Sequence, residues 1–209
     1  MLKEIDRNLP RKEREKRYKR REILMAALKV FAQKGYEQAN IEEVAVAAEF
    51  SKGALYNYFS HKEEMFTALL QEGFADFEEI VQAAMRSDLP VREQYRTFAL
   101  RTLQYFDENP DFFTLIIKEN LQMKIKLLSR FREQFASKRA ALIEQMAEPL
   151  RRGIKQRKIR DIDPVQLVEV FWNIIFAFLL HSRCAEDKPA MEKDVDAIVA
   201  IFFDGIELA

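Results

Sequence analysis

The segment SKGALYNYFSHK, residues 51–62, carries groups of the kinds that contact nucleic acids. If residues 52–59 form a helix, Leu55 and Phe59 share one side and can pack into a core. The opposite side then carries Gly53 and Asn57, which are small or hydrogen-bonding and uncharged. A short helix with no carboxylate on its outward face suits the major groove of DNA.

Each outward group of this segment has a contact that it can make with duplex DNA. Gly53 lets the backbone approach closely, Ala54 can meet a thymine methyl group, and Asn57 can pair with a base edge. Hydroxyl, amide and ammonium groups can hold phosphates, and the candidates are Asn40, Ser51, Lys52, Tyr56, Tyr58 and Lys62. The alternative from the pattern alone is that the two tyrosines only cover a hydrophobic core.

Helix-capping residues divide the first third of the chain into several helices. Gly35 can close a first helix, and Asn40 and Ser51 can accept hydrogen bonds from the free amides at the starts of two more. Ser60 and Glu63 form a capping pair for a fourth. The predicted helices span residues 11–34, 41–48, 52–59 and 61–86. The second and third form a helix-turn-helix, whose second helix reads bases.

The rest of the chain also predicts helices, over residues 91–108, 111–120, 121–157, 165–183 and 189–207, with a bend or break at Pro149. The 5 glycines and 6 prolines are too few for a sheet with many tight turns. We therefore expect an all-α fold. We expect a three-helix DNA-binding domain over residues 1–60 and a larger helical domain over residues 61–209.

Residues 23–66, ILMAALKVFAQKGYEQANIEEVAVAAEFSKGALYNYFSHKEEMF, resemble the DNA-binding domain of the TetR (tetracycline-repressor-like) family of bacterial transcriptional regulators. The most specific piece is SKGALYNYF with the following lysine, and the remainder is similar only in length and helical character. The resemblance implies DNA-contact positions at Ser51, Lys52, Gly53, Ala54, Tyr56, Asn57, Tyr58 and Lys62. Asn40 stands where the family often has threonine.

The turn of the helix-turn-helix departs from the family pattern. AGVSKG is usual there, whereas this chain has AEFSKG, with Glu49 and Phe50. A residue other than glycine in a left-handed conformation costs about 1–2 kcal/mol, and a carboxylate repels phosphates. We expect a slightly altered turn with DNA binding retained.

Two apolar helices near the C-terminus predict a homodimer. The run Val165–Leu180 is apolar on more than one stripe, which exceeds what one chain's core needs. At sixteen residues it is shorter than the about 20 that span a membrane, so we expect a buried helix and no membrane partner. Residues 164–183 and 189–207 are the expected dimer interface, as the resemblance also implies; the alternative is that both helices are intrachain core.

The resemblance implies a small effector that binds between the larger domain's helices and releases the dimer from a palindromic operator. Aromatic residues there favour an apolar or aromatic compound, and the candidates are Phe98, Tyr105, Phe112, Phe113, Phe131, Phe135, Trp172 and Phe176. Each can instead be an ordinary core residue. Asn120, Gln122, Asn173 and His181 are polar groups that can orient a ligand. Repression is expected, and activation by the effector is the less common mode in the family.

The N-terminal region is strongly basic. Nine basic and two acidic residues lie between Arg7 and Arg21. An arm or extended first helix carrying Arg14, Arg17, Arg20 and Arg21 can follow the DNA backbone or enter the minor groove. The alternative is a solvated helix extension with no partner.

Other classes of protein fit less well. Two histidines, one cysteine and no glycine-rich phosphate loop or zinc-ligand spacing argue against an enzyme, a metal site or a cofactor. The single Cys184 and a first stretch without an apolar signal core fit the cytoplasm. A helical module whose basic part binds an acidic protein remains the second alternative, and it would show no preference among DNA sequences.

Overall fold

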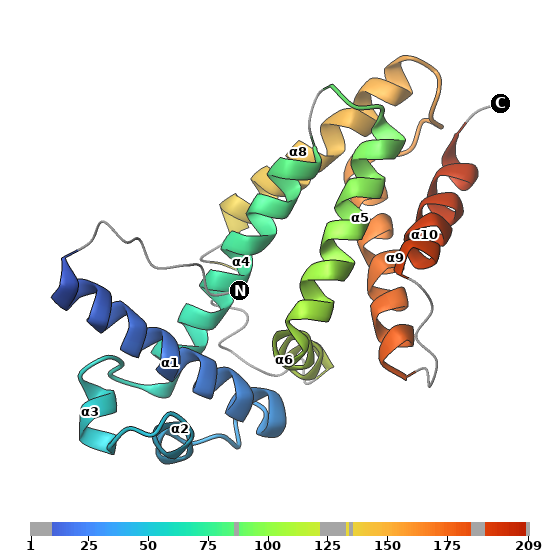
Figure 1. The fold of residues 1–209 in the computed structure, drawn as a ribbon. Helices are drawn as coiled ribbons and strands as arrows, with labels where there is room; N and C mark the ends of the chain where they lie inside the picture. The colour runs from blue at the N-terminus through green and yellow to red at the C-terminus, as the bar shows by residue number, and fades with distance from the viewer. Residues whose placement is uncertain (1–9, 86–87, 122–132, 134–135, 185–190, 208–209) are drawn as a thin grey trace. The chain divides into compact units, whose positions relative to one another are not determined.

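The computed structural model describes residues 10–85, 88–121, 133, 136–184 and 191–207 (Figure 1). In this part of the chain the fold is all-α, as predicted, and the one β-type pairing is an isolated bridge between Ile159 and Glu207. The helices are α1 Arg11–Lys34, α2 Ile41–Ala47, α3 Lys52–Tyr56, α4 Lys62–Ala84, α5 Val91–Glu108, α6 Pro110–Leu121, α8 Ala136–Lys155, α9 Pro164–Cys184 and α10 Met191–Ile206.

The chain forms two compact units, each made from two separate stretches. Unit 1 contains the described residues of 1–76 and 109–134, and unit 2 contains those of 77–108 and 135–209. The helix-turn-helix and α6 therefore lie in one unit, and α5, α8, α9 and α10 lie in the other. The functional boundary after residue 60 stays a prediction, because compactness alone does not define a functional domain.

The core of unit 1 joins α1 to the helices that follow it. Ile23, Phe31, Leu55 and Phe59 are almost fully buried. The rings of Phe31 and Phe66 meet edge to face, with centroids 5.7 Å apart. Leu55 and Phe59 thus pack inward, as their spacing predicts.

Helix α6 packs against α1 within unit 1, although α5 lies between them in the sequence. The Lys118 ammonium group donates to the carbonyl oxygens of Ala32 and Gln33 at 2.6 and 2.8 Å, near the C-terminal end of α1. On the same helix, Phe112 fills space that Gly73 leaves open, since a Cβ atom at Gly73 would lie 2.0 Å from the phenyl ring. These contacts explain why α6 belongs to unit 1.

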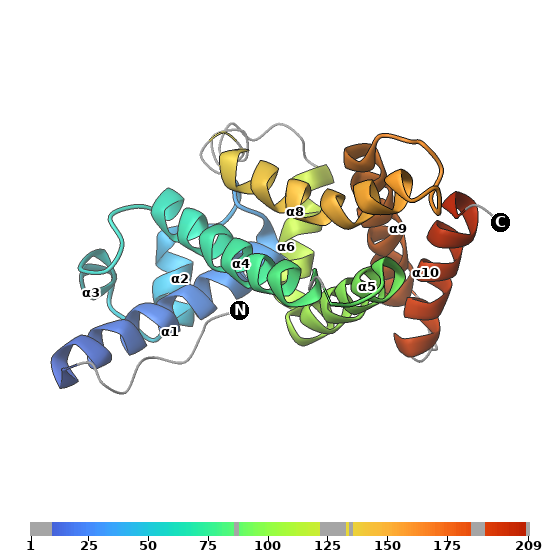
Figure 2. The ribbon, with the colours of Figure 1, turned by 90° about the horizontal axis from the view of Figure 1, so that it is seen from above.

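The core of unit 2 is built around Tyr95 on α5. Its hydroxyl group donates to the carbonyl oxygen of Met146 on α8 at 2.8 Å, and burial raises its pKa well above the ordinary value. Its ring lies 4.8 Å from that of Phe171 on α9 and 5.7 Å from that of Phe203 on α10. Figures 1 and 2 show α5, α9 and α10 side by side.

Candidate nucleic-acid interface and effector region

Two capping bonds set the starts of the helix-turn-helix helices, as predicted. The side-chain oxygen of Asn40 accepts from the Glu43 amide at 2.8 Å and begins α2. The Ser51 hydroxyl oxygen accepts from the Ala54 amide at 3.2 Å and begins α3. At the start of α4, Glu64 accepts from the Ser60 amide at 2.7 Å, a bond that the sequence prediction did not include.

Helix α3 ends earlier than predicted, at Tyr56 instead of residue 59. The Tyr58 amide donates to the Leu55 carbonyl three residues back, at 2.9 Å, so the last turn tightens. Asn57 keeps helical angles as the C-terminal cap, with φ −71° and ψ −13°. Its side chain therefore stays on the same exposed side as Gly53, and the expected outward face survives the shortening.

The outward face of α3 is open to solvent within its own chain. Ser51, Lys52, Gly53, Tyr56 and Asn57 are exposed, and Ala54 and Tyr58 are half-buried. A Cβ atom at Gly53 would meet no heavy atom of the described residues within 4 Å, and Gly53 has no positive φ. Neither backbone conformation nor packing against the part of the chain that the structure describes therefore explains a glycine inside this helix.

The turn between α2 and α3 is a Schellman motif with glutamate at the position usually held by glycine. The Phe50 amide donates to the Ala45 carbonyl at 2.9 Å, and the Glu49 amide donates to the Val46 carbonyl at 3.1 Å. Glu49 has φ 59°, in the left-handed region. The strain anticipated for a residue other than glycine is therefore present.

Phe50, the second unusual residue of the turn, packs against Tyr58, a candidate DNA-contact residue. Its ring meets that of Tyr58 edge to face, with centroids 6.2 Å apart and planes at 87°. The pair holds the half-buried Tyr58 ring beside the turn, which limits its rotamers.

Lys52 and Lys62 have partners inside the chain. The Lys52 ammonium group donates to the Glu42 carboxylate on α2, and this bond holds the pKa of Glu42 below its ordinary value. The Lys62 ammonium group donates to the carbonyl oxygens of Tyr36 and Ala39 at 2.7 and 2.8 Å and lies over the Tyr36 ring. Lys62 thus joins α4 to the loop between α1 and α2, and its contact with phosphate stays a prediction.

The predicted effector residues fall into different parts of the molecule. Phe98, Tyr105, Trp172 and Phe176 lie in unit 2, Phe112 and Phe113 lie in unit 1, and Phe131 and Phe135 lie outside the described residues, as does Gln122. The rings of Phe77, Phe98 and Trp172 form one cluster, with centroids 5.1 to 6.3 Å apart. Phe77, which lies on α4, was not among the predicted residues.

A buried hydroxyl group next to this cluster was also missed. Thr102 on α5 is fully buried, and its hydroxyl oxygen has no hydrogen-bond partner among the residues that the structure describes. It lies one turn from Phe98 and one turn from Tyr105 on the same helix. A buried hydroxyl group without a partner costs about 1–3 kcal/mol, which makes Thr102 a candidate for binding a polar atom of a ligand.

Helices α9 and α10 each bury one stripe and leave apolar side chains exposed. Val170 and Leu180 on α9 are 50% and 38% exposed, and Ile201 on α10 is 58% exposed. The expectation that α9 is buried therefore holds for one side only. By length and composition, Pro164–Arg183 can also cross a membrane, a test that core helices of soluble proteins pass too.

Two family models match this chain. Residues 23–69 match "Bacterial regulatory proteins, tetR family", and residues 90–187 match "Tetracyclin repressor-like, C-terminal domain". The chain belongs to the TetR family. It is therefore a DNA-binding transcriptional regulator and not an enzyme.

Individual TetR-family proteins resemble different portions of the chain. The HTH-type transcriptional repressor NicS of Pseudomonas putida is 36% identical over 104 residues, which span 47% of each chain. PfmR, a TetR-family regulator of Thermus thermophilus, has a TM-score of 0.72 at 24% identity, covering 87% of this chain and 97% of its own. AibR, solved with isovaleryl coenzyme A and operator DNA, has a TM-score of 0.70 at 19% identity, covering 88% of this chain and 98% of its own. The two structures support the TetR fold.

Proposed function

We propose that this TetR-family regulator is a repressor that binds palindromic operator DNA as a homodimer and is released by a small, largely apolar effector. The match to NicS, a repressor, supports the direction of regulation. Operator DNA lies in the bacterial cytoplasm, so the protein acts there.

The open surroundings of Gly53 are the observation that carries the DNA-binding part of this proposal. Glycine in a helix is about 1 kcal/mol less favourable than alanine, and no described residue within 4 Å of Gly53 requires it. A partner that approaches the backbone closely gives the missing reason. Asn57 on the same exposed side supplies an amide that can pair with an adenine edge.

The exposed apolar residues of α9 and α10 support the homodimer. Val170, Leu180 and Ile201 lie on the two helices predicted to form the interface, residues 164–183 and 189–207. A second copy would cover them and form a four-helix contact. Two copies can then present their α3 helices about 34–36 Å apart, one turn of DNA.

The aromatic cluster of unit 2 supports an apolar effector with at least one polar atom. Phe98 and Trp172 offer ring surfaces, and the Thr102 hydroxyl offers one hydrogen bond. AibR, of similar fold, was solved with an acyl coenzyme A, which makes acyl compounds the first class to screen. An effector that favours a different spacing of the α3 helices by about 1–3 kcal/mol would lower operator occupancy.

Substitution of Asn57 by alanine tests whether α3 reads bases. We expect the variant to lose preference at one base position in each half-site, at a cost of about 1–3 kcal/mol for the correct base. Tyr58→Ala is the comparison, since loss of a phosphate contact weakens binding to all sequences alike. Unchanged sequence preference in Asn57→Ala would remove Asn57 from the reading face.

A further inference from the structure

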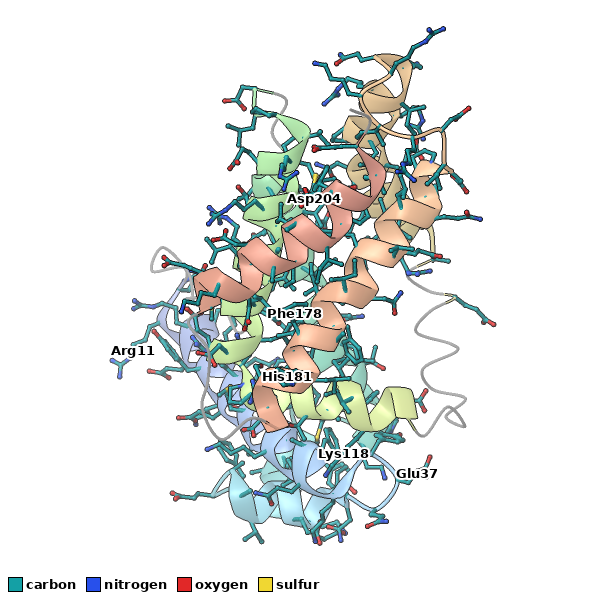
Figure 3. The ribbon with its side chains drawn as sticks, turned by 90° about the vertical axis from the view of Figure 1, so that its right-hand side faces the viewer. Arg11, Glu37, Lys118, Phe178, His181 and Asp204 are labelled. Atoms are coloured by element: carbon teal, nitrogen blue, oxygen red, sulfur yellow. The ribbon has the colours of Figure 1, made fainter. Side chains whose placement is uncertain are left out.

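The first part of α1 extends beyond the core of unit 1. No side chain from residue 10 to residue 19 is buried, whereas Ile23 and Leu24 are almost fully buried. Residues 11–20 form a rod about 15 Å long at 1.5 Å per residue. Figure 3 shows Arg11, at the start of this rod, with its side chain directed outward, and that side chain is 87% exposed.

Three lysines of this extension share one side of the helix. At 100° per residue, Lys12, Lys16 and Lys19 fall within about 60° of one another. The same side of α1, further along, buries Ile23 and Val30. We name Lys12, Lys16 and Lys19 the basic stripe; it continues the inward-facing side of α1 past the edge of the core.

The acidic residues of the extension do not neutralise the basic stripe. Glu15 pairs with Arg11 at 2.7 Å, and Glu13 pairs with Arg17 at 3.0 Å, so arginines outside the stripe hold both carboxylates. Lys12, Lys16 and Lys19 make no ion pair with any residue that the structure describes. The basic stripe thus places three positive charges on the side of α1 that is buried further along the helix. This arrangement indicates a negatively charged partner.

The extension lies at the end of unit 1 where α3 lies. The Arg20 guanidinium group, one residue beyond the stripe, sits 4.7 Å from the ring centroid of Phe59. Phe59 follows α3 by three residues and donates its amide to Leu55 on α3. Figures 1 and 2 both show the start of α1 and α3 at the same end of unit 1.

We propose that the basic stripe binds the phosphates that flank the base pairs read by α3. This inference rests on the proposed function, because it needs α3 to lie in the major groove. Phosphates follow one another about every 3.4 Å of axis along a strand, so a rod of about 15 Å can reach roughly four of them. Such contacts add affinity without sequence preference.

The test removes the three charges and keeps the helix. Lys12→Gln, Lys16→Gln and Lys19→Gln are combined in the full chain, since glutamine has nearly the helix propensity of lysine. The control combines Lys155→Gln, Lys158→Gln and Lys193→Gln, three exposed lysines of unit 2 with the same change in charge. Binding is measured on long duplexes of mixed sequence and on a duplex selected by the wild-type protein, at several salt concentrations.

We expect the stripe variant to bind both duplexes at least tenfold more weakly at low salt. Its dependence of log K on log salt should flatten by about one unit for each lysine that contacts a phosphate. Its ranking of base sequences should not change, and the control should match wild type. A stripe variant with the affinity and salt dependence of the control overturns this proposal while leaving base reading by α3 intact. Failure of the wild type to prefer any sequence would instead overturn the proposed function.

Discussion

The carboxylate of Glu42 on α2 accepts a hydrogen bond from the ammonium group of Lys52 on α3, and this bond ties the two helices of the helix-turn-helix together. Both side chains remain more than half exposed. The contact therefore positions Lys52 at the proposed interface but leaves it free to exchange Glu42 for a phosphate.

The first prediction concerns the pH dependence of this contact. The hydrogen bond from Lys52 lowers the pKa of Glu42 in the folded chain. Its stabilisation is therefore present above the unfolded pKa and is lost as pH falls through the lower, folded pKa. In NMR titrations, Lys52→Met should raise the pKa of Glu42 towards its ordinary value, and Lys29→Met should leave it unchanged. An ordinary pKa for Glu42 in the wild type would contradict the contact.

Gly53→Ala should separate stability from DNA binding. The added methyl group meets no atom within 4 Å and replaces glycine in a helix, so the free energy of unfolding should rise by up to about 1 kcal/mol. Operator affinity should fall tenfold or more, about 1.4 kcal/mol, because the methyl group keeps the backbone from the bases. Chemical denaturation and a binding titration measure the two effects. A variant that is more stable and binds equally well would contradict close approach at Gly53.

Glu49→Gly should relieve strain in the turn. Glu49 has φ 59°, which costs a residue other than glycine about 1–2 kcal/mol, so the variant should unfold at higher denaturant concentration. It should also bind the operator more tightly, because a carboxylate near phosphates is removed. Glu49→Gln is the matched control, since it removes the charge and keeps the strain. A large loss of operator affinity in Glu49→Gly would show that the glutamate is needed.

A charge in the proposed interface should break the dimer. Val170→Asp or Ile201→Asp introduces a carboxylate at a position whose native side chain is 50% or 58% exposed, respectively, in the single chain. The fold of the monomer should therefore tolerate either change. Analytical ultracentrifugation should report a dimer for wild type and a monomer for the variants. Leu89→Asp, at a 38% exposed position outside α9 and α10, is the control. Dimers that persist in both variants would place the interface elsewhere.

Thr102→Val should leave the fold intact and impair the effector response. Valine has nearly the shape of threonine, and the lost hydroxyl group has no partner in the described structure. In thermal unfolding, the stability of the variant should therefore be unchanged or higher, by up to about 3 kcal/mol. A fatty acyl compound that releases wild-type protein from its DNA should release the variant less well. A strongly destabilised variant would show that the hydroxyl group has a structural partner.

Local features of the fold were visible in the sequence, because a cap acts on its own helix. Asn40 and Ser51 cap α2 and α3 as predicted. The strain at Glu49 could also be predicted from the sequence, because a turn of this type requires a left-handed residue at that position.

Features that depend on distant parts of the chain were not visible. The early end of α3 arises in a last turn whose Leu55 and Phe59 are anchored in the core. The membership of α6 in unit 1 depends on Lys118 reaching the carbonyl oxygens of Ala32 and Gln33, more than eighty residues away. Sequence periodicity shows which side of a helix is buried, but it does not show which other helix packs against that side.

Selection of bound fragments from a pool of random duplexes tests the central claim most directly, since it asks whether the exposed side of α3 recognises bases. The wild-type protein should enrich one two-fold-symmetric sequence whose half-sites lie about one DNA turn apart. A pool that stays random after repeated rounds, although the protein is folded and dimeric, would contradict the claim.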